Sequence, residues 1–189
     1  GADVVGFQTY ANGQNFSRAA RDYTAAEGTD TELEYQGRTI RIGTFPISID
    51  TAWFEQTAAA APASRTAVQI RERVGGRRKI ILCVDRLDYT KGIEHRLRAF
   101  EELLRRRRIT VNNTVMVQIA VPSRETVPDY SETRDRIEQM VGRINGEFSA
   151  PGRVAVHYSR RNLTREELDG YYRATNVMLV TPLRDGMNL

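Results

Sequence analysis

The stretch Ile80-Ile81-Leu82-Cys83-Val84-Asp85-Arg86-Leu87-Asp88-Tyr89-Thr90-Lys91-Gly92 decides the fold and points to the chemistry. Its apolar start predicts a buried strand over residues 80–84. Arg86 and Lys91 lie in the loop that follows, and a helical pattern begins at Ile93. A helix N-terminus offers unpaired N–H groups, and the glycine permits close approach of a ligand. The stretch therefore predicts an anion site between a strand and a helix.

Strands and helices alternate regularly from Lys79 onward. Further buried strands are indicated by apolar runs at residues 114–121, 154–158 and 177–180. Helices are indicated by apolar residues at helical spacing over residues 93–104 and 129–145, and by a capping-box pattern from Thr164 to Glu167. This alternation predicts an α/β fold with a Rossmann-like parallel sheet that helices cover on both faces.

The first 50 residues show a separate pattern. Strands are predicted at residues 4–8, 32–35 and 38–44, a helix at residues 15–23, and a loop at residues 27–31. Pro46 interrupts any regular element, so residues 45–50 suit a crossover between two domains. A helical pattern over residues 65–74 ends at Gly75-Gly76. We therefore place the domain boundary within residues 50–77.

The bulk composition excludes several classes of protein. The 189 residues are 40% hydrophobic and 28% charged, which suits a soluble globular protein, and no apolar run approaches the ~20 residues of a membrane helix. The single cysteine, Cys83, indicates a buried structural thiol and a reducing compartment, which predicts a cytoplasmic location. The net charge of +4 owes much to Arg105-Arg106-Arg107-Arg108, a pattern typical of a solvated helix end rather than of nucleic-acid binding.

Ligands of parallel sheets bind beyond the carboxyl ends of the strands. The loops at that edge are expected at residues 86–92, 122–125, 159–163 and 181–189. Each of them carries arginine, at Arg86, Arg124, Arg160 with Arg161, and Arg184. Because a guanidinium group binds phosphate oxygens bidentately, a rim of this composition predicts a phosphate or pyrophosphate ligand.

The individual candidates differ in how strongly the pattern supports them. Arg86 and Lys91 are favoured as a diphosphate clamp, because cations beside a helix N-terminus need an anion for compensation. Arg124 suits either a second anionic group or a solvated position next to Ser123 as a cap, and the pattern leaves both open. Asp185 precedes a glycine, which predicts a tight turn whose N–H groups and carboxylate could bind sugar hydroxyls.

Other chemistries find little support. His95 and His157 are interpreted as structural residues, and their spacing with a single cysteine does not suit a metal site. The sequence contains no P-loop, no Gly-x-Gly-x-x-Gly and no Gly-x-Ser-x-Gly. We therefore expect no metal and no cofactor.

The sequence closely resembles the trehalose-6-phosphate synthases, the retaining GT-B glycosyltransferases of family 20. The resemblance rests on residues 84–92 together with Pro122-Ser123-Arg124, Gly142-Arg143-Ile144-Asn145-Gly146 and Thr181-Pro182-Leu183-Arg184-Asp185-Gly186-Met187-Asn188-Leu189. It implies twin Rossmann-like domains. Residues 1–50 would end the first, acceptor-side domain, residues 51–76 would form hinge helices, and residues 77–189 would form most of the nucleotide-sugar-binding domain.

The resemblance also implies a reaction and its ligands. Glucose would pass from UDP-glucose or ADP-glucose to glucose 6-phosphate, with anomeric configuration retained. Arg86 and Lys91 would bind the donor diphosphate and Arg124 the acceptor phosphate. The donor glucose would be surrounded by Asp185, Gly186, Met187, Asn188 and Leu189, with Asp185 accepting from its hydroxyls. Asn162 and Leu163 would lie near the base.

Two alternatives to this function stay open at this point. The chain could belong to another GT-B enzyme with a different acceptor, or to a non-catalytic module that senses a sugar phosphate. We expect the chain to be an internal piece of a longer protein, which alone binds nucleotide weakly and has no turnover. The sequence does not decide between UDP and ADP in the donor or whether the protein is a homo-oligomer.

Overall fold

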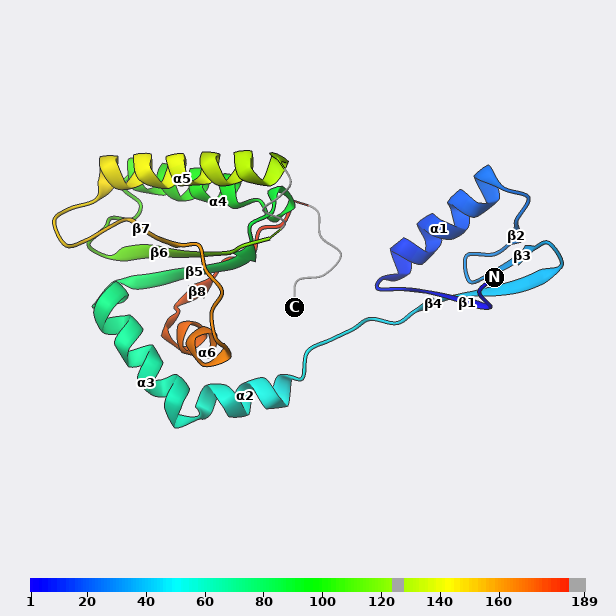
Figure 1. The fold of residues 1–189 in the computed structure, drawn as a ribbon, viewed down its shortest axis with the longest axis horizontal. Helices are drawn as coiled ribbons and strands as arrows, with labels where there is room; N and C mark the ends of the chain where they lie inside the picture. The colour runs from blue at the N-terminus through cyan, green and yellow to red at the C-terminus, as the bar shows by residue number, and fades with distance from the viewer. Residues whose placement is uncertain (124–127, 184–189) are drawn as a thin grey trace. The chain divides into compact units, whose positions relative to one another are not determined.

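A computed structural model describes residues 1–123 and 128–183, which form two compact units, residues 1–50 and residues 51–183. The second unit holds a four-stranded sheet in the order β7-β6-β5-β8 (Figure 1). Its strands are β5 (Lys79–Arg86), β6 (Thr114–Val121), β7 (Val156–Ser159) and β8 (Val177–Met178). Every pairing in this sheet is parallel, which confirms the α/β fold class.

Helices cover both faces of this sheet, as the alternation predicts (Figure 1). One face carries α4 (Ile93–Arg105) and α5 (Pro128–Phe148), and the other carries α3 (Ala61–Ile70) and α6 (Arg165–Ala174). Leu97 of α4 and Ile137 of α5 are fully buried against the first face. Burial of each such side chain contributes roughly 1.5–3 kcal/mol, so the two apolar layers hold the sheet in place.

The register of the central strands brings their loops to one edge. β5 and β6 are paired residue by residue, from Lys79 opposite Thr114 to Arg86 opposite Val121. The two strands therefore end together. β8 is paired with β5 over two residues, Ile81 with Val177 and Leu82 with Met178.

Two helices open the second unit. α2 (Thr51–Ala59) and α3 contact α6, and a π-helical turn, η1 (Arg71–Gly75), leads into β5. Pro62 lies in the first turn of α3, where a missing N–H costs nothing, so it begins a helix rather than interrupting one. The assignment of residues 51–76 as a hinge between domains stays a prediction.

The first unit holds a mixed sheet in the order β1-β4-β3-β2, with β1 parallel to β4 and the other pairings antiparallel. Its elements are β1 (Val4–Phe7), α1 (Tyr10–Tyr23), β2 (Glu27–Gly28), β3 (Glu32–Tyr35) and β4 (Arg38–Thr44). The helix begins five residues before the expected Asn15, because Thr9 accepts a hydrogen bond from the Asn12 N–H and caps it. Part of the expected loop at residues 27–31 is β2, which pairs with β3.

Strand ends differ from the sequence-based boundaries by a few residues, and the loop 122–127 is described only up to Ser123. Within the described residues, no helix has the length and apolar character that a membrane crossing requires.

Candidate functional site

The order of the strands marks one position on the sheet. From β5 the chain moves outward to β6 and β7, and then returns to β8 on the opposite side of β5. In open parallel sheets, ligands bind beyond the carboxyl ends of the strands at such a reversal. The reversal lies beside Arg86, the last residue of β5. The loop of residues 86–92, here called the clamp loop, therefore occupies the place where this fold class binds ligands.

The clamp loop is held firmly at both of its ends. The Leu87 N–H donates to the Val121 carbonyl at 2.8 Å, which ties the start of the loop to β6. Residues 89–91 form a short 3₁₀ turn, η2 (Tyr89–Lys91), and Gly92 is the N-cap residue that precedes α4. Arg86 is exposed, whereas Lys91 is only 7% exposed. The loop thus presents one cation to solvent and holds the other in the body of the unit.

Asp88 organises the turn between these two cations. Its carboxylate accepts from the Thr90 N–H at 2.9 Å and from the Thr90 hydroxyl at 2.8 Å. Burial alone would raise the pKa of Asp88, but these hydrogen bonds, the Tyr130 hydroxyl and the charge of Arg86 lower it below its ordinary value. Asp88 is therefore a charged anchor for the loop.

Gly92 is required by its backbone and by its neighbour. Its φ of 65° and ψ of 27° lie in the left-handed region, which side chains other than glycine adopt at a cost. A Cβ atom at this position would collide with the Thr181 carbonyl oxygen. The glycine thus allows the start of α4 to approach the exit of β8 closely.

A buried arginine, which the sequence reasoning missed, lies directly beneath the clamp loop. Arg96 of α4 is 2% exposed and forms an ion pair with Asp85 of β5 at 2.6 Å. It also donates to Gln118 of β6 at 3.1 Å, to the Lys91 carbonyl at 3.2 Å and to the Thr181 hydroxyl at 3.0 Å. The sequence does carry a signal for this burial, because position 96 lies on the apolar helix face of Ile93, Leu97 and Phe100.

The structure brings the exit of β8 against the clamp loop. The Leu183 N–H donates to the Thr90 carbonyl at 2.8 Å, beside the contact of Thr181 with Arg96. Residues 181–189 were expected at the site, but the described residues end at Leu183. The predicted site residues beyond that point are Arg184, Asp185, Gly186, Met187, Asn188 and Leu189. Arg124 also lies outside the described residues, next to Ser123.

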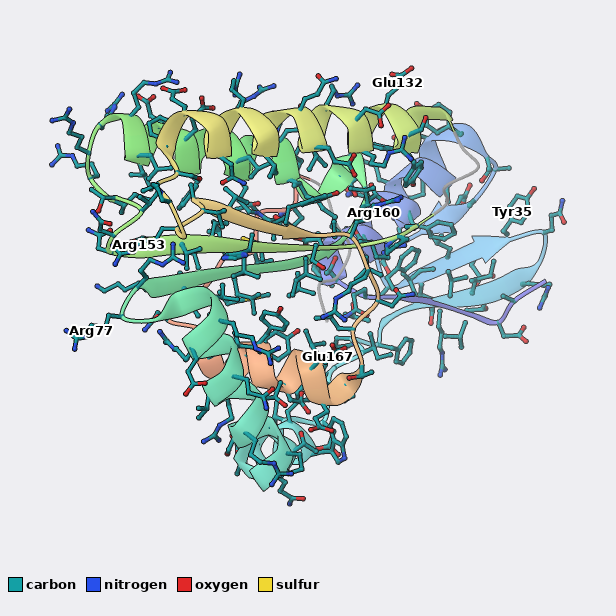
Figure 2. All side chains as sticks on the ribbon, turned by 60° about the vertical axis from the view of Figure 1, so that its left-hand side comes forward. Tyr35, Arg77, Glu132, Arg153, Arg160 and Glu167 are labelled. Atoms are coloured by element: carbon teal, nitrogen blue, oxygen red, sulfur yellow. The ribbon has the colours of Figure 1, made fainter. Side chains whose placement is uncertain are left out.

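The loop after β7 lies farther from the clamp loop. β7 is at the sheet edge, with β6 between it and β5. Asn162 is exposed, whereas Leu163 packs against the core between the sheet and α6. Arg160 lies at the same end of the sheet as the clamp loop (Figure 2), and Arg161 donates to Glu167 at 2.8 Å. That Asn162 and Leu163 contact a ligand stays a prediction.

Arginines at the opposite end of the sheet make structural contacts. Arg77 and Arg153 lie at that end, away from Arg160 (Figure 2). Arg153 donates to Asn112 at 2.5 Å. Arg78 is buried and donates to backbone carbonyls, among them Val154 at 2.9 Å and Gly75 at 3.3 Å. A buried guanidinium saturated by carbonyls serves packing and helix capping rather than ligand binding.

The histidines and the cysteine lie in ordinary environments. Burial, and to a lesser extent Arg78, lowers the pKa of His157, which favours the neutral form of this strand residue. His95 is exposed on α4. Cys83 is buried in the core, and that burial raises the pKa of its thiol to about 11, so it is a packing residue. Across residues 1–123 and 128–183, no three His, Cys, Asp or Glu side chains cluster as metal ligands would.

This arrangement suits the binding of an anion. Arg86, Lys91 and the N-terminus of α4 place positive charge around one loop at the switch point of the sheet. A phosphate group there would receive charge-assisted hydrogen bonds from the two side chains.

Comparison with known proteins gives one consistent result. A family model described as glycosyltransferase family 20 matches residues 1–189. A trehalose-6-phosphate synthase of Mycolicibacterium vanbaalenii is 48% identical, over all of this chain and 40% of its own length. An alpha,alpha-trehalose-phosphate synthase (UDP-forming) from Burkholderia xenovorans, solved in complex with glucose-6-phosphate, is 33% identical with a TM-score of 0.91, over 99% of this chain and 41% of that one.

A further solved structure, an E. coli protein bound with UDP-2-fluoro glucose, is 32% identical with a TM-score of 0.90. The match covers 99% of this chain and 41% of the E. coli chain. The chain thus spans about 40% of the length of the relatives that it matches.

Proposed function

The chain belongs to glycosyltransferase family 20, and we propose that the whole protein transfers glucose from a nucleoside diphosphate glucose to glucose 6-phosphate, giving trehalose 6-phosphate. The relatives solved with glucose-6-phosphate and with UDP-2-fluoro glucose support these two substrates. The uridine of the second ligand favours UDP-glucose over ADP-glucose as the donor to be tested first.

The clamp loop is the observation that carries this proposal. It lies at the switch point of a parallel sheet, with an exposed Arg86 and a buried Lys91 beside the N-terminus of α4. A nucleoside diphosphate leaving group gains negative charge as the glycosidic bond breaks. Cations that meet this charge lower the barrier, because they bind the transition state more strongly than the ground state.

We propose that the anomeric configuration is retained. The bond between the anomeric carbon and the diphosphate oxygen breaks, and the acceptor hydroxyl forms its bond on the same face. The acceptor proton moves to the departing phosphate oxygen, which balances the step without an enzymatic nucleophile. Arg86 and Lys91 would hold that phosphate in position throughout.

The other site residues keep the roles that the resemblance implies. Arg124 would hold the acceptor phosphate, and Asn162 and Leu163 would lie near the base of the nucleotide. The donor glucose would be surrounded by Asp185, Gly186, Met187, Asn188 and Leu189.

Two matched arginine variants of the whole protein test the proposal. With UDP-glucose and glucose 6-phosphate, Arg86→Ala should lower kcat/KM by about 10²–10³-fold, because a charge on the leaving group is left uncompensated. Arg77→Ala removes an arginine at the opposite end of the sheet and should leave kcat/KM within about twofold of the wild type. Equal rates for the two variants would contradict the proposed clamp.

The acceptor and the alternative functions are tested separately. Arg124→Ala should raise the KM for glucose 6-phosphate and leave the KM for the donor unchanged. An unchanged acceptor KM would favour a different acceptor. Calorimetric binding of UDP without any glucosyl transfer in the wild type would favour a non-catalytic sensing module.

A further inference from the structure

A buried guanidinium group joins the two loops that meet at the switch point. The Arg96 side chain is 0% exposed, and its ion-pair partner Asp85 is 6% exposed. Desolvation of two buried charges offsets most of their attraction, and apolar residues of similar size often stabilise such a site as well or better. Stability alone is therefore a weak reason for arginine at a position flanked by the buried Ile93 and Leu97.

The hydrogen bonds of Arg96 reach four separate parts of the second unit. Its Nη1 donates to Asp85 of β5 and Gln118 of β6, its Nη2 donates to the Lys91 carbonyl, and its Nε donates to the Thr181 hydroxyl. The planar fork of a guanidinium group fixes the directions of all these bonds at once. Lysine, with a single ammonium group, could not reproduce this geometry.

The contact with Thr181 matters because it lies beyond the hydrogen bond from the Leu179 N–H to the Leu82 carbonyl, 2.9 Å long, which extends the pairing of β8 with β5. β8 pairs with β5 over two residues, and Thr181 lies beyond the last of them. Arg96 thus holds the Thr181 side chain where the chain leaves β8. Through the Lys91 carbonyl, the same side chain fixes the clamp loop just before Gly92.

We propose that Arg96 is a positioning residue that couples the clamp loop to residues 181–183 at the exit of β8, so that the donor diphosphate is bound in one fixed geometry. This inference rests on the proposed function for its ligands. Hydrogen-bond donors that are already oriented need no reorganisation when charge develops on the leaving group. The coupling by Arg96 would contribute to catalysis by keeping the donors of the clamp loop oriented. We call the bonds of Arg96 to Thr181 and to the Lys91 carbonyl the switch-point latch.

Three variants of the whole protein separate the latch from general stability. Thr181→Val removes one acceptor of the latch and leaves the ion pair of Arg96 with Asp85 intact. Arg96→Lys keeps the buried charge and loses the fork. Thr114→Val is the matched control, because the Thr114 hydroxyl also makes a side-chain hydrogen bond, 2.9 Å to Asn113, at the opposite end of β6.

The first readout is kinetic. Thr181→Val should raise the KM for UDP-glucose by about tenfold, the factor expected for one lost hydrogen bond to a charged group, with the KM for glucose 6-phosphate unchanged. Arg96→Lys should have the same effect or a larger one. The double variant should be no worse than Arg96→Lys alone, because both changes break the same bond. Thr114→Val should leave both KM values at the wild-type level.

The second readout needs no substrate. Hydrogen exchange of the Leu183 N–H, which donates to the Thr90 carbonyl, should accelerate about tenfold in Thr181→Val and in Arg96→Lys, and should be unchanged in Thr114→Val. Faster exchange in Thr181→Val and Arg96→Lys, together with a wild type that transfers no glucose, would overturn the proposed function and keep the latch. Exchange rates and donor KM equal to those of Thr114→Val would overturn the latch, whatever the activity.

Discussion

At the scale of single residues, Gly92 is the position where the clamp loop tolerates least change. Gly92→Ala should lower the free energy of unfolding by about 2 kcal/mol or more, because alanine is strained at a φ of 65° and its Cβ meets the Thr181 carbonyl. Urea unfolding measures the change. Gly146→Ala is the control, since its added Cβ meets nothing within 4 Å on α5 and should raise stability by up to about 1 kcal/mol. A neutral Gly92→Ala would contradict the close approach.

Asp88 should make the free energy of unfolding depend on pH in the acidic range. Its folded pKa is lowered below the ordinary 3.8, so the unfolded chain binds the proton more readily. The contribution is complete above pH 3.8 and is lost as the pH falls through the folded pKa. The difference in free energy of unfolding between wild type and Asp88→Asn should therefore be largest at neutral pH and shrink in acid. Urea unfolding across pH 2–7 measures it, and a difference independent of pH would refute this role.

Single residues also show what a sequence pattern conceals. The clamp loop cations were identified correctly as neighbours of a helix N-terminus, because that inference needs only adjacent residues. Arg96 was missed, because a charged residue on an apolar helix face signals a buried partner without naming it. Its partners, Asp85, Gln118 and Thr181, are 11, 22 and 85 residues away along the chain.

At the scale of secondary-structure elements, α6 provides the clearest test of local sequence signals. The predicted capping box is confirmed, with Glu167 N–H donating to the Thr164 hydroxyl at 3.2 Å and Thr164 N–H donating to the Glu167 carboxylate at 2.8 Å. Thr164→Ala should lower the free energy of unfolding by about 1 kcal/mol. Ser64→Ala in α3 is the control. Among the described residues, its hydroxyl bonds only the Ala60 carbonyl one turn earlier, so urea unfolding should show little change.

Element boundaries depended on whether the cap was recognised. The start of α6 was predicted because both members of its capping box stand in the sequence. The start of α1 was placed late, because Phe16 to Tyr23 carry its apolar spacing whereas its cap, Thr9, precedes a polar first turn. β2 could not be predicted, because two residues become a strand only through pairing with β3.

At the scale of the whole molecule, coverage decides what this chain can do alone. All of this chain matches the relative from Mycolicibacterium vanbaalenii, but it covers only 40% of the length of that relative. We expect the remaining length of the protein to supply part of the site, so residues 1–189 alone should bind UDP weakly and form no measurable trehalose 6-phosphate. Calorimetry and a product assay test this, with the whole protein as the positive control. Product formation by the isolated chain would refute it.

The parallel sheet was predictable, but the order of its strands was not. Alternating strands and helices indicate parallel pairing on local evidence. Nothing local states that β8 returns to β5 instead of extending the sheet beyond β7. The rule for ligand position does not need the strand order, because all strands of a parallel sheet end at the same edge. The contact between the clamp loop and residues 181–183 follows only from the strand order.

The late return of β8 has a consequence for how the protein is made. β5 pairs with β6 and β6 with β7 across 35 and 40 residues of chain, as from Lys79 to Thr114 and from Met116 to Val156. The Ile80 N–H of β5, in contrast, donates to the Asn176 side chain beside β8 across 96 residues. Contacts between distant residues form late in folding, and a chain leaving the ribosome must be synthesised past β8 before this contact exists. We therefore expect the loops of the switch point to come together after β5, β6 and β7 have paired. A partly folded chain would hold the clamp residues without the geometry to bind a nucleotide.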